Sequence, residues 1–184
     1  ICATRVRSWG DKMIFNVLMY IIFMLFYANN NYVKDLSLHK PYHGSFMKGQ
    51  GWTTVGSSIV AYDNIILTSD TKSQMGSIWL LKPIEYHNWK IQVDFKIHGE
   101  HTNSLYGDGF AFWYVKQHST EGPVFGNHDY FNGLGIMFDT YSNHQDIHKH
   151  IHPYISGQIN DGSYHYDHDR DGTHSELNGC SVYY

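Results

Sequence analysis

The sequence predicts an all-β protein built from antiparallel strands, and three observations carry this prediction. Aromatic residues make up 16% of the 184 residues, charged residues only 16%, and 17 residues are glycine. This composition suits strands joined by tight turns better than a helical bundle. Short apolar runs recur between Gly-rich turns, and no helical periodicity of apolar residues occurs after residue 28. Because the length suits one domain with a sizeable core, we expect a single antiparallel β-sandwich.

The first 28 residues are expected to precede this domain. Translation is expected to start at Met13, and residues 14–28 form an almost wholly apolar run that follows the basic residues Arg7 and Lys12. Such a run is short for a membrane span and suits the core of a signal peptide with cleavage near Ala28. A buried core helix is the alternative. The sequence therefore predicts a leader over residues 1–28, a domain over residues 29–184, and entry into the secretory pathway.

The chain has two cysteines, Cys2 and Cys180. Cys2 lies in or before the expected leader and so is not expected to pair with Cys180 in the mature chain. A partner outside this sequence, an intermolecular bond and a free thiol remain open for Cys180. The first alternative is favoured, because the sequence stops four residues later in mid-pattern.

The clearest strand signal covers residues 89–97, where every odd position is large and apolar and every even position is polar. Such alternation is typical of a strand with one buried and one solvated face. A continuous apolar run at 110–115 predicts a strand buried on both faces, and a second run at 134–138 predicts another buried strand. Weaker strand signals occur at 65–67 and 77–81.

A hairpin is predicted near the end of the chain. Residues 154–159 and 163–166 read as two strands around Asn160-Asp161-Gly162, which is an Asp-Gly turn signal. Alternating carboxylates then lead to Asp171 and Gly172, like the opening of an EF-hand loop. Asn178 stands where an EF-hand needs its bidentate Glu, so we expect a carboxylate-rich calcium loop of another kind.

Two further loops carry oxygen ligands beside predicted strands. Asp139 and Asn143 lie four residues apart just past the strand at 134–138, which suits a loop folded around calcium; a polar turn is the alternative. Asp108 lies between Gly107 and Gly109 before the strand at 110–115. The glycines allow rare backbone geometry around a rigidly placed carboxylate, and an ordinary turn aspartate is the alternative.

Residues 144–152 contain four histidines: His144, His148, His150 and His152. Imidazoles could ligate a transition metal. Because the spacing is irregular and no cysteine helps, a solvated loop is favoured. The net charge of −4 has no basic excess, so the sequence does not indicate nucleic-acid binding.

Several of these motifs together resemble those of the L-type (legume-like) lectins, in particular the vesicular integral-membrane mannose-binding branch of the early secretory pathway. The similarity runs from about residue 34 to residue 180, nearly the whole mature chain. The motifs are Gly107-Asp108-Gly109 before an aromatic strand, Gly122-Pro123-Val124-Phe125-Gly126, Asp139-Thr140-Tyr141-Ser142-Asn143, Pro153-Tyr154-Ile155-Ser156, Tyr166-Asp167-His168-Asp169-Arg170-Asp171-Gly172 and Gly179-Cys180.

The resemblance implies a concanavalin A-like jelly roll, a cis peptide before Asp108, and a specific set of ligands. The implied calcium ligands are Asp139, the backbone carbonyl of Tyr141, Asn143 and Asp171. The implied mannose-binding residues are Asp108, Asn143 and His168, with Ser73 at the edge of the site. Asn143 would then touch both ion and sugar. Ser142 departs from the proline of close relatives, which leaves the loop less stiff.

The resemblance also implies that the domain continues past Cys180, with a disulfide partner, further strands and a Gly-Asp-Leu loop, and then a membrane span and a cytoplasmic tail. The given chain is therefore expected to be a C-terminally truncated fragment with unpaired sheet edges, poor stability and weak or no sugar binding.

The implied function is a calcium-dependent lectin, not an enzyme. It would bind high-mannose N-glycans on glycoproteins that move between the endoplasmic reticulum and the Golgi. A glycoside hydrolase on the same sandwich is an alternative, but retaining hydrolysis needs two carboxyls about 5–5.5 Å apart, and the clearest strand offers only Asp94. An adhesion sandwich with calcium as a staple is the third possibility.

Overall fold

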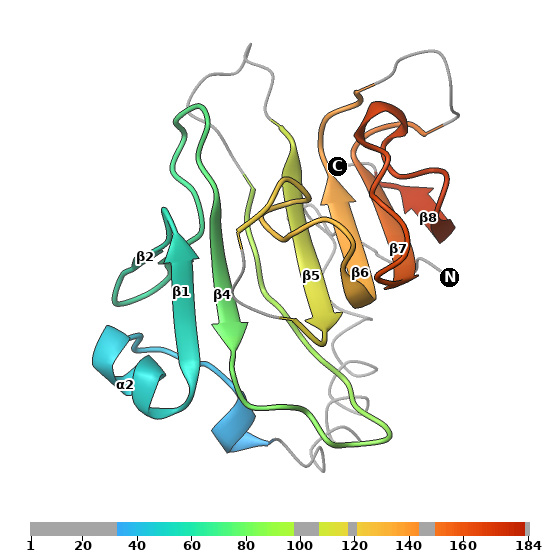
Figure 1. Cartoon of the computed structure of the whole chain (residues 1–184). Helices are drawn as coiled ribbons and strands as arrows, with labels where there is room; N and C mark the ends of the chain where they lie inside the picture. Colours follow the sequence, from blue (N-terminus) through green and yellow to red (C-terminus); the bar gives the residue numbers. More distant parts are fainter. Residues whose placement is uncertain (1–32, 98–106, 118–120, 144–149, 183–184) are drawn as a thin grey trace, which may run out of the picture.

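The computed structural model describes residues 33–97, 107–117, 121–143 and 150–182, and antiparallel strands form most of its regular structure (Figure 1). A four-stranded sheet has the order β5-β6-β7-β8, and two smaller sheets pair β1 with β4 and β2 with β3. The strands are β1 Trp52–Gly56, β2 Ile59–Val60, β3 Ile65–Ile66, β4 Gly76–Leu80, β5 Gly109–Val115, β6 Asn132–Asp139, β7 Tyr154–Asp161 and β8 Glu176–Ser181. The predicted all-β antiparallel class is confirmed.

Three short helical segments accompany the strands within the described residues. They are the 3-10 turns η1 Lys34–Leu36 and η2 His168–Arg170 and the α-helix α2 Gly44–Gly49. The helix α2 was not expected from the sequence, because a helix of six residues is too short to show an apolar periodicity. It packs Met47 into the interior beside β1.

The main core lies on one face of the four-stranded sheet. Met137 of β6 and Phe131 are fully buried there, and Trp113 of β5 meets the Phe131 ring edge-on at a centroid distance of 4.9 Å. Gly135 pairs with Trp113 across the strands, and a Cβ at Gly135 would lie 2.7 Å from the Trp113 ring. Glycine therefore makes the room that this indole needs. The strand over 110–115 is only half-buried, which corrects the expectation of burial on both faces.

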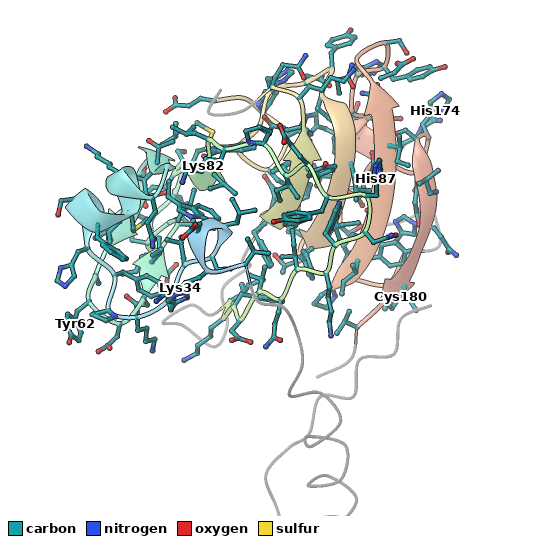
Figure 2. The ribbon with its side chains drawn as sticks, turned by 90° about the horizontal axis from the view of Figure 1, so that it is seen from below. Lys34, Tyr62, Lys82, His87, His174 and Cys180 are labelled. Carbon is teal, nitrogen blue, oxygen red and sulfur yellow. The ribbon has the colours of Figure 1, made fainter. Side chains whose placement is uncertain are left out.

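The prediction of a strand over residues 89–97 is wrong. This segment forms no ladder with any strand of the described residues, and its large apolar side chains are exposed, Phe95 to 54%. The segment crosses the four-stranded sheet on the face opposite the main core, and His87 marks its approach in Figure 2. Its rings do touch that face: Phe95 lies 4.6 Å from the Phe110 ring, and Trp89 lies 5.0 Å from the Tyr114 ring. The alternation of apolar and polar residues correctly predicted an apolar face. It could not predict whether another strand lies alongside to form the hydrogen-bonded ladder.

The predicted hairpin is half correct. The strand β7 and the turn at Asn160-Asp161-Gly162 are present, but residues 163–166 form no return strand, and β7 pairs with β8 instead. The Asn160 side chain holds the turn by accepting the Gly162 N–H at 3.0 Å. Tyr166 then turns inward to the core, where Asp129 accepts its backbone N–H at 2.7 Å. Burial of this one ring outweighs the local strand signal.

Strand register brings three segments together at one end of the four-stranded sheet. Asp139, the last residue of β6, pairs with Gly109 at the start of β5 and with Tyr154 at the start of β7. The residues just before β5, just after β6 and just before β7 therefore share this end. The sheet itself places Asp108, the loop that follows Asp139, and His152 beside one another.

The expected leader over residues 1–28 and the histidines at 144 and 148 lie outside the described residues. Cys180 lies on the edge strand β8 (Figure 2) and is disulfide-bonded, which overturns the free-thiol alternative; the other cysteine, Cys2, is outside the described residues. Among the described residues, no helix is both long and apolar enough to cross a membrane.

Candidate functional site

A small polar cavity opens at the end of the sheet where β5, β6 and β7 meet. Its volume is about 20 Å³, which accommodates one water-sized sphere or one ion. Five of its eight lining residues carry carboxylate, amide or imidazole groups that can bind a cation or a hydroxyl, and the other three are a proline and two aromatic residues. The lining residues are Asp108, Pro123, Phe125, Asp139, Asn143, Tyr166, His168 and Asp171.

Two buried carboxylates form the floor of the cavity. Asp139 is 6% exposed and Asp171 is 4% exposed. The Nε2 atom of His152 lies between them, 3.5 Å from an oxygen of each carboxylate. One ligand atom from each of these three residues falls within 4.8 Å of the other two. The three side chains therefore converge on a space in which one metal ion could contact all of them.

Burial raises the pKa of Asp139 from 3.8 to about 7. The hydrogen bond from the Tyr141 backbone N–H lowers this pKa, while the negative charges of Asp171 and Asp108 raise it. An ionised carboxylate is thus unfavourable here in the absence of a compensating positive charge. A bound cation would supply that charge, so the electrostatics of the floor suit a metal site.

This pKa predicts how the stability of the calcium-free protein depends on pH. Between about pH 4 and pH 7 the folded state holds a proton on Asp139 that the unfolded chain has already lost. The free energy of unfolding should therefore receive a contribution from Asp139 that falls as the pH rises through this window. Thermal unfolding in EDTA from pH 4.5 to pH 8 measures it. The Asp139→Asn variant, which carries no titrating carboxyl, should lack this part of the slope, and parallel pH profiles for the two proteins would contradict the prediction.

Backbone hydrogen bonds tie the loop after β6 to its neighbours. Asp139 accepts the Tyr141 N–H at 3.0 Å, and Asp171 accepts the Asn143 N–H at 3.0 Å. The Thr140 N–H donates to the Asp108 carbonyl at 2.9 Å. The loop over residues 139–143 is therefore linked both to the acidic loop near η2 and to the segment before β5. A displacement of any one of these three segments would strain its hydrogen bonds to the others.

The Gly107–Asp108 peptide bond is cis, in agreement with the resemblance. A Cβ at Gly107 would lie 2.6 Å from the Cβ of Tyr141, so only glycine lets these two segments approach so closely. The side chain of Asp108 is exposed at the rim of the cavity, where it is available to a ligand from solvent.

Aromatic rings form the opposite wall. Tyr166 is buried, and its ring meets the ring of His168 edge-on at 4.9 Å and that of Phe125 edge-on at 6.1 Å. Burial raises the pKa of Tyr166 far above its ordinary value, and the charge of Asp139 raises it further. The Tyr166 phenol therefore stays protonated, and the wall presents packed rings beside the acidic floor.

The structure brings together most of the residues singled out from the sequence. Asp108, Asn143 and His168 line the cavity with Asp139 and Asp171. Tyr141 lies in the same loop, but its side chain is not among the lining residues, and Ser73, an exposed loop residue with φ of 59°, is not among them either.

Sequence reasoning named His152 only as a less favoured metal ligand in a solvated loop, and it missed the aromatic wall of Phe125 and Tyr166. The expectation of a solvated histidine loop is wrong for His150 and His152, whose side chains are only 11% and 7% exposed. A signal for His152 was its place two residues before β7, whose first residue, Tyr154, pairs with Asp139. No pattern in the neighbouring sequence indicated that Tyr166 is buried, because its burial depends on the path of the chain after the turn at 160–162.

The donor set fits a hard cation such as calcium, as the resemblance implies. Two carboxylates at the floor, an amide side chain in the lining and the backbone carbonyls of the 139–143 loop are oxygen ligands of the kind that calcium binds, with water completing its six to eight ligands. His152 is a nitrogen donor in the same space and departs from an all-oxygen site.

The chain is an all-β protein with a small acidic cavity at one end of its main sheet. The sequence matches the Legume-like lectin family over residues 29–184, and the chain belongs to that family. Its members bind carbohydrates and are not enzymes, so the glycoside hydrolase alternative is set aside.

Two relatives show the extent of the similarity. The chain is 44% identical over 150 residues to the VIP36-like protein of Mus musculus, covering 81% of this chain and 43% of that protein. It is 41% identical over 157 residues to the vesicular integral-membrane protein VIP36 of Canis lupus familiaris, covering 84% of this chain and 44% of that protein. The chain thus spans less than half the length of these relatives.

The fold is also similar to a solved structure, that of the VIP36 exoplasmic/lumenal domain in its Ca2+/Man3GlcNAc-bound form. The TM-score is 0.73 at 41% identity, covering 82% of this chain and 60% of that one. The predicted legume-lectin jelly roll is confirmed by this likeness.

Proposed function

We propose that this chain is the carbohydrate-recognition domain of a calcium-dependent lectin that binds high-mannose N-glycans on secretory glycoproteins. The observation that carries the proposal is a single cavity lined by Asp108, Asn143 and His168 together with the two buried carboxylates of Asp139 and Asp171. The VIP36 domain with a similar fold is a protein whose solved form contains both Ca2+ and Man3GlcNAc.

Asp139, Asn143, Asp171 and the backbone carbonyl of Tyr141 would hold the calcium ion. When bound, calcium supplies positive charge and fixes the loop; it has no part in any covalent reaction. Asp139 would give up the proton that its raised pKa retains near neutral pH. Asn143 is already tied to Asp171 through its backbone, so ordering of the ion site would also order the asparagine that faces the sugar.

Mannose would be held by Asp108, Asn143 and His168, with Ser73 near the edge. An ionised carboxylate at Asp108 can accept two sugar hydroxyls, and charge-assisted hydrogen bonds of this kind are strong. The Asn143 amide would use its oxygen toward the ion and its N–H groups toward the sugar. His168 is held by its ring contact with Tyr166 and can bond a hydroxyl.

The compartment proposed is the lumen of the early secretory pathway, comprising the endoplasmic reticulum, the intermediate compartment and the Golgi, with cargo transport or quality control as the role. The family match begins at residue 29, directly after the proposed leader over residues 1–28, and this supports the proposed boundary. The relative named as a vesicular integral-membrane protein supports membrane anchoring of the full-length protein.

Retention of the full-length protein on a mannose column tests the proposal. The wild-type protein should be retained in calcium and released by EDTA. Asp108→Asn should lose retention, because the neutral amide accepts fewer hydroxyl hydrogen bonds, while calcium should still raise its melting temperature as it does in the wild type. Asp94→Asn, an exposed carboxylate in the segment over 89–97, is the matched control and should be retained. Retention that survives EDTA would contradict the calcium-coupled mechanism.

A further inference from the structure

His152 lies against the two buried carboxylates of the cavity, and an all-oxygen calcium site does not explain its position. Its Nε2 atom lies 3.5 Å from Asp139 Oδ2 and 3.5 Å from Asp171 Oδ2. All three side chains are less than one-tenth exposed. The imidazole therefore faces the place where the two carboxylates converge, and its ring nitrogen stands at the distance from both oxygens that ligands of one ion have from each other.

The neighbouring segment holds His152 in this position. The ring of His150 stacks on the ring of Tyr154 at a centroid distance of 3.7 Å and an interplanar angle of 15°. Its Nε2 atom lies 2.8 Å from Glu176 Oε2, and the Tyr154 hydroxyl donates to Glu176 Oε1 at 2.9 Å. Glu176 belongs to β8, so these contacts fasten the chain on both sides of His152 to the sheet. Contacts of the flanking residues His150 and Tyr154 therefore hold the His152 segment in place without a metal ion.

The chemistry of the donor set decides which ions this arrangement favours. Calcium and magnesium prefer oxygen ligands, whereas imidazole nitrogen suits divalent transition metals. Two carboxylates and one imidazole whose ligand atoms lie within 4.8 Å of one another form a mixed oxygen–nitrogen set. Neutral imidazole is a good ligand for zinc, adds less to the binding of manganese, and adds little to the binding of calcium.

We propose that His152 is a metal ligand, and that with Asp139 and Asp171 it makes this cavity a site for a divalent transition-metal ion, with manganese and zinc as its probes, in competition with calcium. The proposal rests on the cation site of the proposed function but is independent of sugar binding. It assigns a role to one residue of the histidine-rich stretch that the mannose site leaves unused.

Manganese binding to the full-length protein tests this assignment, with free Mn2+ followed by electron paramagnetic resonance and zinc and calcium added as competitors. His152→Gln should lower the affinity for Mn2+ by at least about 10-fold, the smallest loss typical even of a residue that only supports a metal ligand. Its affinity for Ca2+ should change by less than about 3-fold, since calcium gains little from imidazole. The retained Ca2+ affinity also shows that the variant is folded.

Pulsed electron paramagnetic resonance identifies the ligand directly. Bound Mn2+ in the wild-type protein should show the nitrogen modulation of a coordinated imidazole, and His152→Gln should lose it. His168→Gln removes the imidazole that lines the cavity and should keep the signal. Absence of nitrogen modulation in the wild type, or its loss only in His168→Gln, would overturn the assignment.

Two affinity patterns would also overturn it. If His152→Gln weakens Ca2+ and Mn2+ equally, the residue only supports the cavity. If the variant binds both ions more tightly, the imidazole is a positive counter-charge that competes with metal. If the proposed calcium site itself is wrong, the result differs from both of these patterns, because Asp139→Asn would then leave the Ca2+ affinity unchanged.

Discussion

Replacement of Asp171 by asparagine is expected to lower the calcium affinity by at least about 100-fold, or about 3 kcal/mol, because the site loses one of its two buried negative charges. The backbone should tolerate the change. Asp171 has φ of 49° and ψ of 36°, a left-handed conformation that asparagine also adopts readily. The asparagine oxygen can still accept the Asn143 N–H. The loss should therefore reflect the charge rather than a rearranged loop.

Isothermal titration with calcium, together with thermal unfolding with and without calcium, measures this effect. Asp169→Asn is the matched control, because it removes the same charge two residues away from an exposed position outside the cavity lining. That variant should bind calcium within about 3-fold of the wild type, as expected for an exposed charge. Equal losses in the two variants would mean that net charge, and not ligation by Asp171, governs calcium affinity.

Replacement of Gly109 by alanine is expected to destabilise the fold by about 3 to 5 kcal/mol, which places it among the most damaging single substitutions. Gly109 has φ of 139°, and a Cβ there would lie 2.1 Å from the Phe138 carbonyl oxygen. Gly109 pairs with Asp139 and follows Asp108 directly. The strain would therefore act at the contact between the proposed sugar-binding and calcium-binding segments.

Urea unfolding of the purified variants, and their secreted yield, measure this loss. Gly157→Ala provides the control within the same four-stranded sheet, because its Cβ would meet Ile136 Cδ1 only at 3.6 Å, an ordinary contact. Its stability should stay within about 1 kcal/mol of the wild type. If Gly109→Ala is as stable as Gly157→Ala, the close approach of β5 and β6 is not the constraint described above.

The sheet end that forms the site could be predicted from local patterns only in part. The run before Asp139 predicted β6, and Asp108 between two glycines predicted a rigidly placed carboxylate. Neither pattern predicted that the two would be neighbours from the residues alone; the resemblance to the legume-like lectins supplied that. In the structure, the pairing of Gly109 with Asp139 is what joins them. Strand pairing is a long-range contact, and short motifs do not encode it.

The segment over 89–97 shows the limit of periodicity. Its alternation correctly identified an apolar face, and Phe95 does touch Phe110 and Phe138. It failed as a strand prediction because a ladder needs a neighbour that offers backbone hydrogen bonds, and the described residues place none alongside it. The same applies to residues 163–166, where burial of Tyr166 draws the chain away from the predicted return strand.

The sequence by itself determined the all-β class, the presence of the strands β6 and β7, and the acidic and glycine-flanked residues that could bind an ion or a sugar. These follow from composition, side-chain alternation and turn chemistry, which act over a few residues. Only the tertiary structure decided that His152 faces Asp139 and Asp171, and that Tyr166 closes the opposite wall. Burial and strand register act between residues far apart in the chain, and they turned a histidine expected in solvent into a candidate metal ligand.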